Sequence, residues 1–199
     1  ALSKSPKLKY LRLDSVPISE LFSIGGRKTL KELYIETMDL PCLNFPIGQL
    51  GNLETLIIKC KIMSSAEGIT DLIINCEKIH TFQFYNWDVL PKYTLNSMLS
   101  LRYLRCLHLC TMKNSYESWY EFSDLEEIWI YQREPLLTRR YQIESFLERS
   151  KNLKTYSFLN CKQHQNFNDL FDEIVSDIGH KCKRYFAKKG DNFLGSIFY

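Results

Sequence analysis

One short apolar pattern recurs seven times along this chain and constrains its fold more than any other feature. Each copy has an apolar residue, two further residues, a second apolar residue, one further residue and a third apolar residue. The seven copies are Leu8-Leu11-Leu13, Leu30-Leu33-Ile35, Leu53-Leu56-Ile58, Ile79-Phe82-Phe84, Leu104-Leu107-Leu109, Leu125-Ile128-Ile130 and Leu153-Tyr156-Phe158. Their starts lie 22, 23, 26, 25, 21 and 28 residues apart. Because self-similarity at such a period is typical of repeat architectures, we interpret the chain as about seven irregular repeats.

The spacing inside each copy predicts a short strand. The second and third apolar residues are two positions apart, so their side chains point to the same face of a strand. One such strand cannot bury its apolar side, whereas strands stacked side by side form a parallel sheet with a continuous core behind it. The predicted strands, paired in parallel and in sequence order, are 10–14, 32–36, 55–59, 81–85, 106–110, 127–131 and 155–159. The expected fold class is α/β, a curved solenoid or horseshoe with this sheet on its concave side.

The segments between the copies are expected to return along the convex side as helices or irregular turns. Residues 65–76 and 139–149 carry apolar side chains at helical spacing. Residues 91–101 begin with a proline, which suits the first turn of a helix. Residues 41–52 contain two prolines and two glycines, so this segment is expected to be irregular.

Composition and charge narrow the functional classes. Of the 199 residues, 45% are hydrophobic and 25% are charged, which is ordinary for a folded domain. The net charge of +3 argues against a dedicated nucleic-acid-binding domain, which is normally much more basic. No apolar run is long enough to span a bilayer, and residues 1–9 lack the apolar stretch of a signal peptide. The seven scattered cysteines and the lack of any Asn-x-Ser/Thr sequon favour an intracellular, cytoplasmic or nuclear, location.

Over residues 5–165 the repeated pattern resembles the leucine-rich-repeat superfamily. The segments NLETLIIKC (52–60) and NLKTYSFLNC (152–161) are similar to the cysteine-containing repeats of F-box/leucine-rich-repeat proteins. The segment IVSDIGHKCKRY (174–185) is similar to the helical part of such a repeat. This resemblance implies repeats that hold a substrate for a cullin-RING ubiquitin ligase. No F-box precedes Lys7, so we expect the chain to bind the ligase adaptor only if an F-box lies outside it.

A second resemblance leaves the function more open. The segment FPIGQLGNLETLII (45–58) resembles repeats of intracellular plant-type immune receptors, although the nucleotide-binding domain of those receptors is not in this sequence. We expect a protein-recognition module that performs no chemistry and needs no cofactor. The alternatives are a nucleic-acid or export-adaptor binding module, the repeat domain of an immune receptor, or a scaffold subunit.

The residues between the core positions of each strand form the predicted partner-binding surface on the concave face. Its aromatic members are expected to dominate, because Tyr and Trp supply much of the binding energy at interfaces. The candidate binding residues are Tyr34, Tyr85, His108, Trp129 and Tyr131. The alternative is that these rings pack under a loop or against the C-terminal segment, since large exposed apolar patches are uncommon.

One strand carries residues that could do chemistry. Cys106, His108 and Cys110 alternate along it and point to one face, with Glu127 one strand away, a set that could supply zinc ligands. Alternate residues of a strand are about 7 Å apart, so we predict no metal site. Side chains at alternate positions of a strand point in parallel and not toward each other, which also argues against a cysteine nucleophile with a histidine base. The sequence has no P-loop, dinucleotide-binding or Gly-x-Ser-x-Gly motif, so we predict no catalytic residues.

The C-terminal part is predicted to close the stack. We divide the chain into a solenoid, residues 1–165, and a capping helix with a tail, residues 166–199. Residues 166–185 carry an apolar stripe at intervals of three and four, which should dock on Tyr156 and Phe158. The alternative is half of an eighth repeat with its strand at Tyr185–Ala187. The basic run Lys181–Lys189 is interpreted as a solvated helix end, with RNA or an acidic membrane surface as the alternative.

Overall fold

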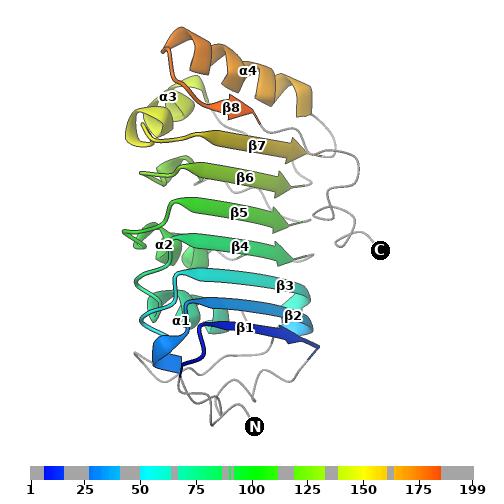
Figure 1. Cartoon of the computed structure of the whole chain (residues 1–199). Coiled ribbons are helices and arrows are strands. Elements are labelled where there is room, and N and C mark those ends of the chain that lie inside the picture. The colour runs from blue at the N-terminus through cyan, green and yellow to red at the C-terminus, as the bar shows by residue number, and fades with distance from the viewer. Residues whose placement is uncertain are drawn as a thin grey trace.

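A single sheet of eight parallel strands organises the chain (Figure 1). The computed structural model describes residues 7–15, 27–40, 50–63, 67–86, 90, 92–111, 119–132, 139–160 and 164–184. The strands follow one another in sequence order: β1 (Tyr10–Asp14), β2 (Glu32–Leu40), β3 (Thr55–Met63), β4 (Thr81–Asn86), β5 (Cys106–Thr111), β6 (Glu127–Gln132), β7 (Thr155–Asn160) and β8 (Lys183–Arg184). The predicted order, direction and first residue of the first seven strands are confirmed.

Six strands run past their predicted ends: β4–β7 by one residue each, and β2 and β3 by more. β2 and β3 continue four residues past the predicted ends, to Leu40 and Met63, and stay paired there. Leu40 is fully buried and Cys60 is buried as well, so the core continues beneath this extension. The seven-copy pattern does not include these positions, and for that reason it placed the strand ends too early.

The three apolar positions of each copy form three rows across the sheet. In register order the second and third rows are Leu11-Leu33-Leu56-Phe82-Leu107-Ile128-Tyr156 and Leu13-Ile35-Ile58-Phe84-Leu109-Ile130-Phe158. All of these side chains are buried in one continuous core, and the first row is buried from Leu30 onward. Complete burial of such a side chain contributes roughly 1.5–3 kcal/mol. A shift of register by one residue would turn every core residue outward, so the rows fix the pairing.

A repeated backbone hydrogen bond marks the start of each strand. At each step from β1 to β7 one carbonyl oxygen accepts two successive amides of the next repeat: Lys9 O accepts from Lys31 N (2.8 Å) and Glu32 N (2.9 Å). The same arrangement recurs with the carbonyl oxygens of Lys31, His80 and Arg105, among others. These bonds satisfy backbone groups at the turn into each strand and set the distance between repeats.

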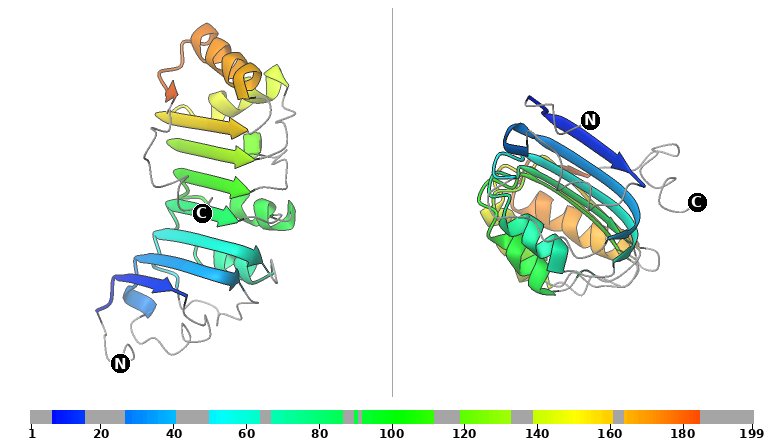
Figure 2. Two further views of the ribbon diagram at one scale, coloured as in Figure 1. Left: turned by 90° about the vertical axis from the view of Figure 1, so that its right-hand side faces the viewer. Right: turned by 90° about the horizontal axis from the view of Figure 1, so that it is seen from below.

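Four helices pack against the same side of the sheet (Figure 2). They are α1 (Glu67–Ile74), α2 (Lys92–Leu99), α3 (Arg140–Arg149) and α4 (His164–Asp177). The helices predicted for residues 65–76, 91–101 and 139–149 are thereby confirmed. Each turns an apolar stripe to the core, as Ile143, Phe146 and Leu147 of α3 do. Within the described ranges no helix combines the length and the apolar character needed to cross a membrane.

The C-terminal helix docks where it was predicted to. Phe171 of α4 lies 4.4 Å from Tyr156 and 5.0 Å from Phe158, measured between ring centroids. The chain then forms β8, which pairs with β7 through Thr155↔Lys183 and Tyr156↔Arg184. The segment after residue 165 is therefore also an eighth strand-bearing unit, as the alternative had it, although its strand begins at Lys183. The residues Tyr185–Ala187 named for that strand lie outside the described part of the chain.

Candidate functional site

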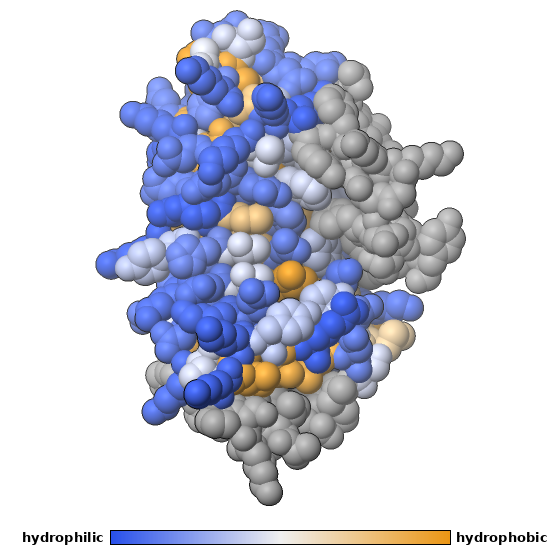
Figure 3. Space-filling model, in the orientation of Figure 1, coloured by the Kyte–Doolittle hydropathy of each residue, from blue (hydrophilic) through white to orange (hydrophobic). Residues whose placement is uncertain are grey.

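The sheet face opposite the helices is the candidate binding surface, and we call it the open face. It carries the residues that alternate with the core rows. Its three register rows are Tyr10-Glu32-Thr55-Thr81-Cys106-Glu127-Thr155, Arg12-Tyr34-Ile57-Gln83-His108-Trp129-Ser157 and Asp14-Glu36-Lys59-Tyr85-Cys110-Tyr131-Leu159. Figure 3 views this side of the molecule and shows a mainly hydrophilic surface with a few apolar side chains between the polar ones.

The structure places the five candidate binding residues on the open face but not equally within reach of a partner. Tyr34 and Trp129 are half-buried, whereas Tyr85, His108 and Tyr131 are only 3%, 6% and 9% exposed. Of the two possibilities that the sequence left open, burial rather than exposure therefore holds for these last three rings. Whether any of the five binds a partner stays a prediction.

Cations and aromatic rings alternate across the first four strands. The guanidinium carbon of Arg12 lies 4.3 Å from the centroid of the Tyr34 ring. The ammonium nitrogen of Lys59 lies 5.6 Å from the rings of both Tyr34 and Tyr85. We call these four residues the cation–aromatic ladder. Cation–π attraction holds each long side chain over a ring, so the ladder presents ordered polar groups.

Two carboxylates fix the exposed end of this ladder. Arg12 Nε donates to both carboxylate oxygens of Asp14, at 2.9 and 2.8 Å, and Arg12 Nη2 lies 3.5 Å from Glu36 Oε2. The Tyr34 hydroxyl donates to Glu36 Oε2 at 2.6 Å. Burial, and then this bond to a carboxylate, raise the pKa of Tyr34 above its ordinary value. The phenol therefore stays a neutral hydrogen-bond donor at physiological pH.

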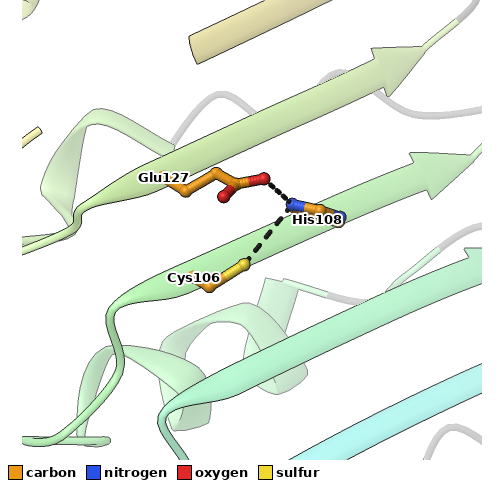
Figure 4. Close-up of side chains that lie close together, drawn as sticks. All are labelled: Cys106, His108 and Glu127. Carbon is orange, nitrogen blue, oxygen red and sulfur yellow. Dashed lines mark hydrogen bonds and ion pairs between the residues drawn. The ribbon is translucent and has the colours of Figure 1, made fainter. Parts of the chain in front are cut away.

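A second group of polar side chains lies at the centre of the sheet (Figure 4). We call Cys106, His108 and Glu127 the thiol–imidazole–carboxylate cluster. Cys106 and His108 come from β5, and Glu127 of β6 is the register partner of Cys106. His108 Nε2 lies 3.4 Å from Cys106 Sγ and 2.7 Å from Glu127 Oε1. One donor atom of each residue lies within 4.8 Å of the other two.

Strand spacing predicted that Cys106, His108 and Cys110 lie too far apart to share one ion, and Cys110 is indeed outside the converging group of described residues. Glu127 of the neighbouring strand completes a set of three instead, which strand spacing did not predict. Alternate residues are indeed separated along the strand, but side chains can lean along it, and here the three tips converge. Trp129 holds the imidazole in place, because its ring stacks on His108 with centroids 4.4 Å apart and planes 9° apart. Sulfur, nitrogen and oxygen ligands of this kind form a donor set that suits a borderline metal ion.

The protonation of Cys106 argues against nucleophilic chemistry in this cluster. Burial and, to a smaller extent, the nearby charge of Glu127 raise the pKa of its thiol to about 12, although a hydrogen bond with Thr81 acts in the opposite direction. A reactive cysteine needs a thiolate, which requires a lowered pKa. Without a metal ion the thiol of Cys106 therefore remains protonated, and the prediction of no cysteine nucleophile stands as a prediction.

No protein-family model matches the chain, and no curated protein matches it.

Two features of the structure were not predicted from the sequence. The cation–aromatic ladder could have been found by comparing register neighbours, since Arg12 pairs with Tyr34 and Lys59 pairs with Tyr85. Trp119, in a short 3₁₀ turn (Trp119–Glu121), is fully buried and anchors the aromatic core below β7. It belongs to no copy of the repeated pattern, so no sequence signal identified it.

Proposed function

We propose that the chain is a leucine-rich-repeat solenoid whose open face binds a segment of another protein. The observation that carries this proposal is the cation–aromatic ladder next to exposed carboxylates at the first strands of a stiff parallel sheet. Arg12 and Asp14 are exposed, and Tyr10 beside them is 53% exposed. Tyrosine and arginine side chains are the ones most enriched at interface hot spots. Because the ladder is already ordered by its internal contacts, a partner would bind with little further loss of side-chain entropy.

The charge of the open face favours a protein partner over a nucleic acid. Its rows include three cationic side chains, those of Arg12, Lys59 and, on β8, Lys183. They also include four carboxylates, from Asp14, Glu32, Glu36 and Glu127. A surface that binds phosphates neutralises them with an excess of Lys and Arg, which these rows lack. Mixed charge with aromatic rings suits a polypeptide that carries both signs of charge.

The resemblance to F-box/leucine-rich-repeat proteins supports a more specific form of the proposal. In this form the open face holds the substrate of a ubiquitin ligase, and the chain itself performs no chemistry. Binding of the ligase adaptor would then require an F-box outside this chain. The free thiols of Cys76, Cys106 and Cys182 support an intracellular setting in this proposal.

Site-specific photocrosslinking in cells tests the proposal. One variant carries the crosslinker at Arg12 and a second carries it at Gln83, both on the open face. A matched control carries it at Tyr141, which is exposed on α3 among the helices. We expect the same protein to be captured from Arg12 and Gln83 but not from Tyr141. Capture of RNA, or equal capture of one protein from both sides, would contradict the proposal.

The salt dependence of binding then separates the two classes of partner. A protein held by rings and paired charges should lose little affinity when salt is raised. A polyanion held by phosphate contacts should lose it steeply, because binding releases condensed counterions. A steep loss with the purified partner would favour the nucleic-acid alternative.

A further inference from the structure

We propose that Cys106, His108 and Glu127 bind one zinc ion at the centre of the open face. The zinc site does not require the protein-binding function, which rests on the cation–aromatic ladder of β1–β4, although His108 and its neighbour Trp129 are also candidate binding residues. Its thiol and imidazole donors suit Zn²⁺ better than Mg²⁺ or Ca²⁺, which prefer oxygen ligands. Cys110, the next residue on the same face of β5, is not part of the converging group among the described residues.

The distances in the cluster are close to those of a zinc site. Bonds of about 2.3 Å to sulfur and about 2.0–2.2 Å to nitrogen and oxygen, at tetrahedral angles, separate the ligand atoms by about 3.4–3.6 Å. Cys106 Sγ and His108 Nε2 are 3.4 Å apart, which already fits. His108 Nε2 and Glu127 Oε1 are 2.7 Å apart and must separate slightly. The Glu127 side chain is 32% exposed and so has room to rotate.

The surroundings hold the ligands ready for a metal ion. All three residues lie in neighbouring central strands, whose backbones are fixed by pairing on both sides. The Trp129 ring stacks on the His108 imidazole and fixes its plane, which keeps Nε2 directed between the thiol and the carboxylate (Figure 4). Sites supported by rigid elements and packed side chains lose less entropy on binding.

The charges of the bound site would balance. On binding, the Cys106 thiol releases its proton to solvent and the sulfur bonds to Zn²⁺, while neutral His108 gives its Nε2 lone pair and Glu127 a carboxylate oxygen. One thiolate and one carboxylate neutralise the two positive charges of the ion. A neutral site is compatible with this half-buried position, where a net charge would be costly. Three protein ligands leave a fourth position, which water can fill.

Titration of the full chain with zinc chloride, followed by calorimetry, tests the proposal. We expect one equivalent to bind and to raise the melting temperature. Cobalt(II) as a spectroscopic probe should give a thiolate-to-metal charge-transfer band and the visible bands of a tetrahedral site. Cys106→Ser should abolish the charge-transfer band, and Glu127→Gln should weaken binding by about tenfold or more. Glu127→Gln keeps the size of a half-exposed side chain, so it should fold even if the cysteine variant does not.

Control variants distinguish the site from adventitious thiol binding. Cys182→Ser removes a half-buried thiol near β8, and Cys110→Ala removes the neighbouring thiol on β5. Both should keep full zinc affinity and the cobalt band. The proposal would be overturned by an absence of stoichiometric binding. It would also be overturned if Glu127→Gln binds zinc as the parent does, or if Cys182→Ser or Cys110→Ala removes the cobalt band.

Discussion

Phe171 is the residue through which α4 attaches to the end of the sheet, and its replacement by alanine should detach that helix. The side chain is fully buried. Its ring centroid lies 4.4 Å from that of Tyr156, 5.0 Å from Phe158 and 6.3 Å from Trp119. Phe171→Ala removes all of these contacts together and leaves a cavity between α4 and β7.

The expected loss of stability follows from this packing. Replacement of a buried phenylalanine by alanine costs about 3–5 kcal/mol. The two close aromatic pairs account for about 1–3 kcal/mol of that loss, at about 0.5–1.5 kcal/mol each. For a chain of this length the melting temperature falls about 2–4 °C per kcal/mol, so the shift should be about 6–20 °C. Phe171→Leu keeps most of the buried apolar area and should cost clearly less.

Thermal and urea unfolding followed by circular dichroism measure this loss. Hydrogen–deuterium exchange should show that the amides of α4 and β8 exchange faster, while those of β3–β5 change little. Tyr141→Ala, which removes an exposed ring from α3, is the matched control and should leave stability nearly unchanged. A loss below about 1 kcal/mol for Phe171→Ala, or one equal to that of the control, would refute the packing argument.

Three further changes test other parts of the structure. Trp129→Ala should weaken partner binding by about 2 kcal/mol or more with little effect on folding, and a lower melting temperature at unchanged affinity would make the ring part of the core. Asn168→Ala removes the buried bond from its amide to the Phe158 carbonyl oxygen (2.7 Å) and should cost about 1–3 kcal/mol in urea unfolding, unless water replaces the donor. The Lys31 ammonium lowers the pKa of Glu54, so this pair stabilises the fold above the ordinary carboxyl pKa and the effect is lost as the pH falls through the lowered pKa. The difference in melting temperature between the parent and Glu54→Gln should therefore shrink in acid, and a constant difference from pH 7 to about pH 3 would contradict this assignment.

The sheet could be predicted from the sequence because residues close together in the chain determine which side chains are buried and where each strand begins. In each copy the spacing of three apolar residues indicates which side chains enter the core. Parallel stacking of the strands then follows, because each strand needs its neighbours to cover these side chains. The first residue of β1–β7 matched the prediction because the register rows are built from those same residues. The strand ends matched less well, since β4–β7 each run one residue further than predicted. β2 and β3 run four residues further, because their ends depend on Leu40 and Cys60, which lie outside the repeated pattern.

The exposure of side chains on the open face could not be predicted in the same way. Periodicity indicates the direction in which a side chain points but not which other atoms cover it. Tyr85 and Tyr131 point away from the helices as expected, yet both are buried. The convergence of Cys106, His108 and Glu127 depends on side-chain rotamers and on stacking with Trp129, which no spacing rule contains.

The affinity of the crosslinked partner for two matched double variants tests the binding role of the open face most directly. The first variant, Arg12→Ala with Tyr34→Ala, removes the exposed end of the cation–aromatic ladder, and calorimetry measures the dissociation constant. The control, Tyr93→Ala with Tyr141→Ala, removes two exposed rings from α2 and α3. We predict that the ladder variant binds about tenfold more weakly or worse, while the control binds as the parent does. An unchanged affinity for the ladder variant, together with a loss for the control, would place the binding surface on the helices and contradict the proposal.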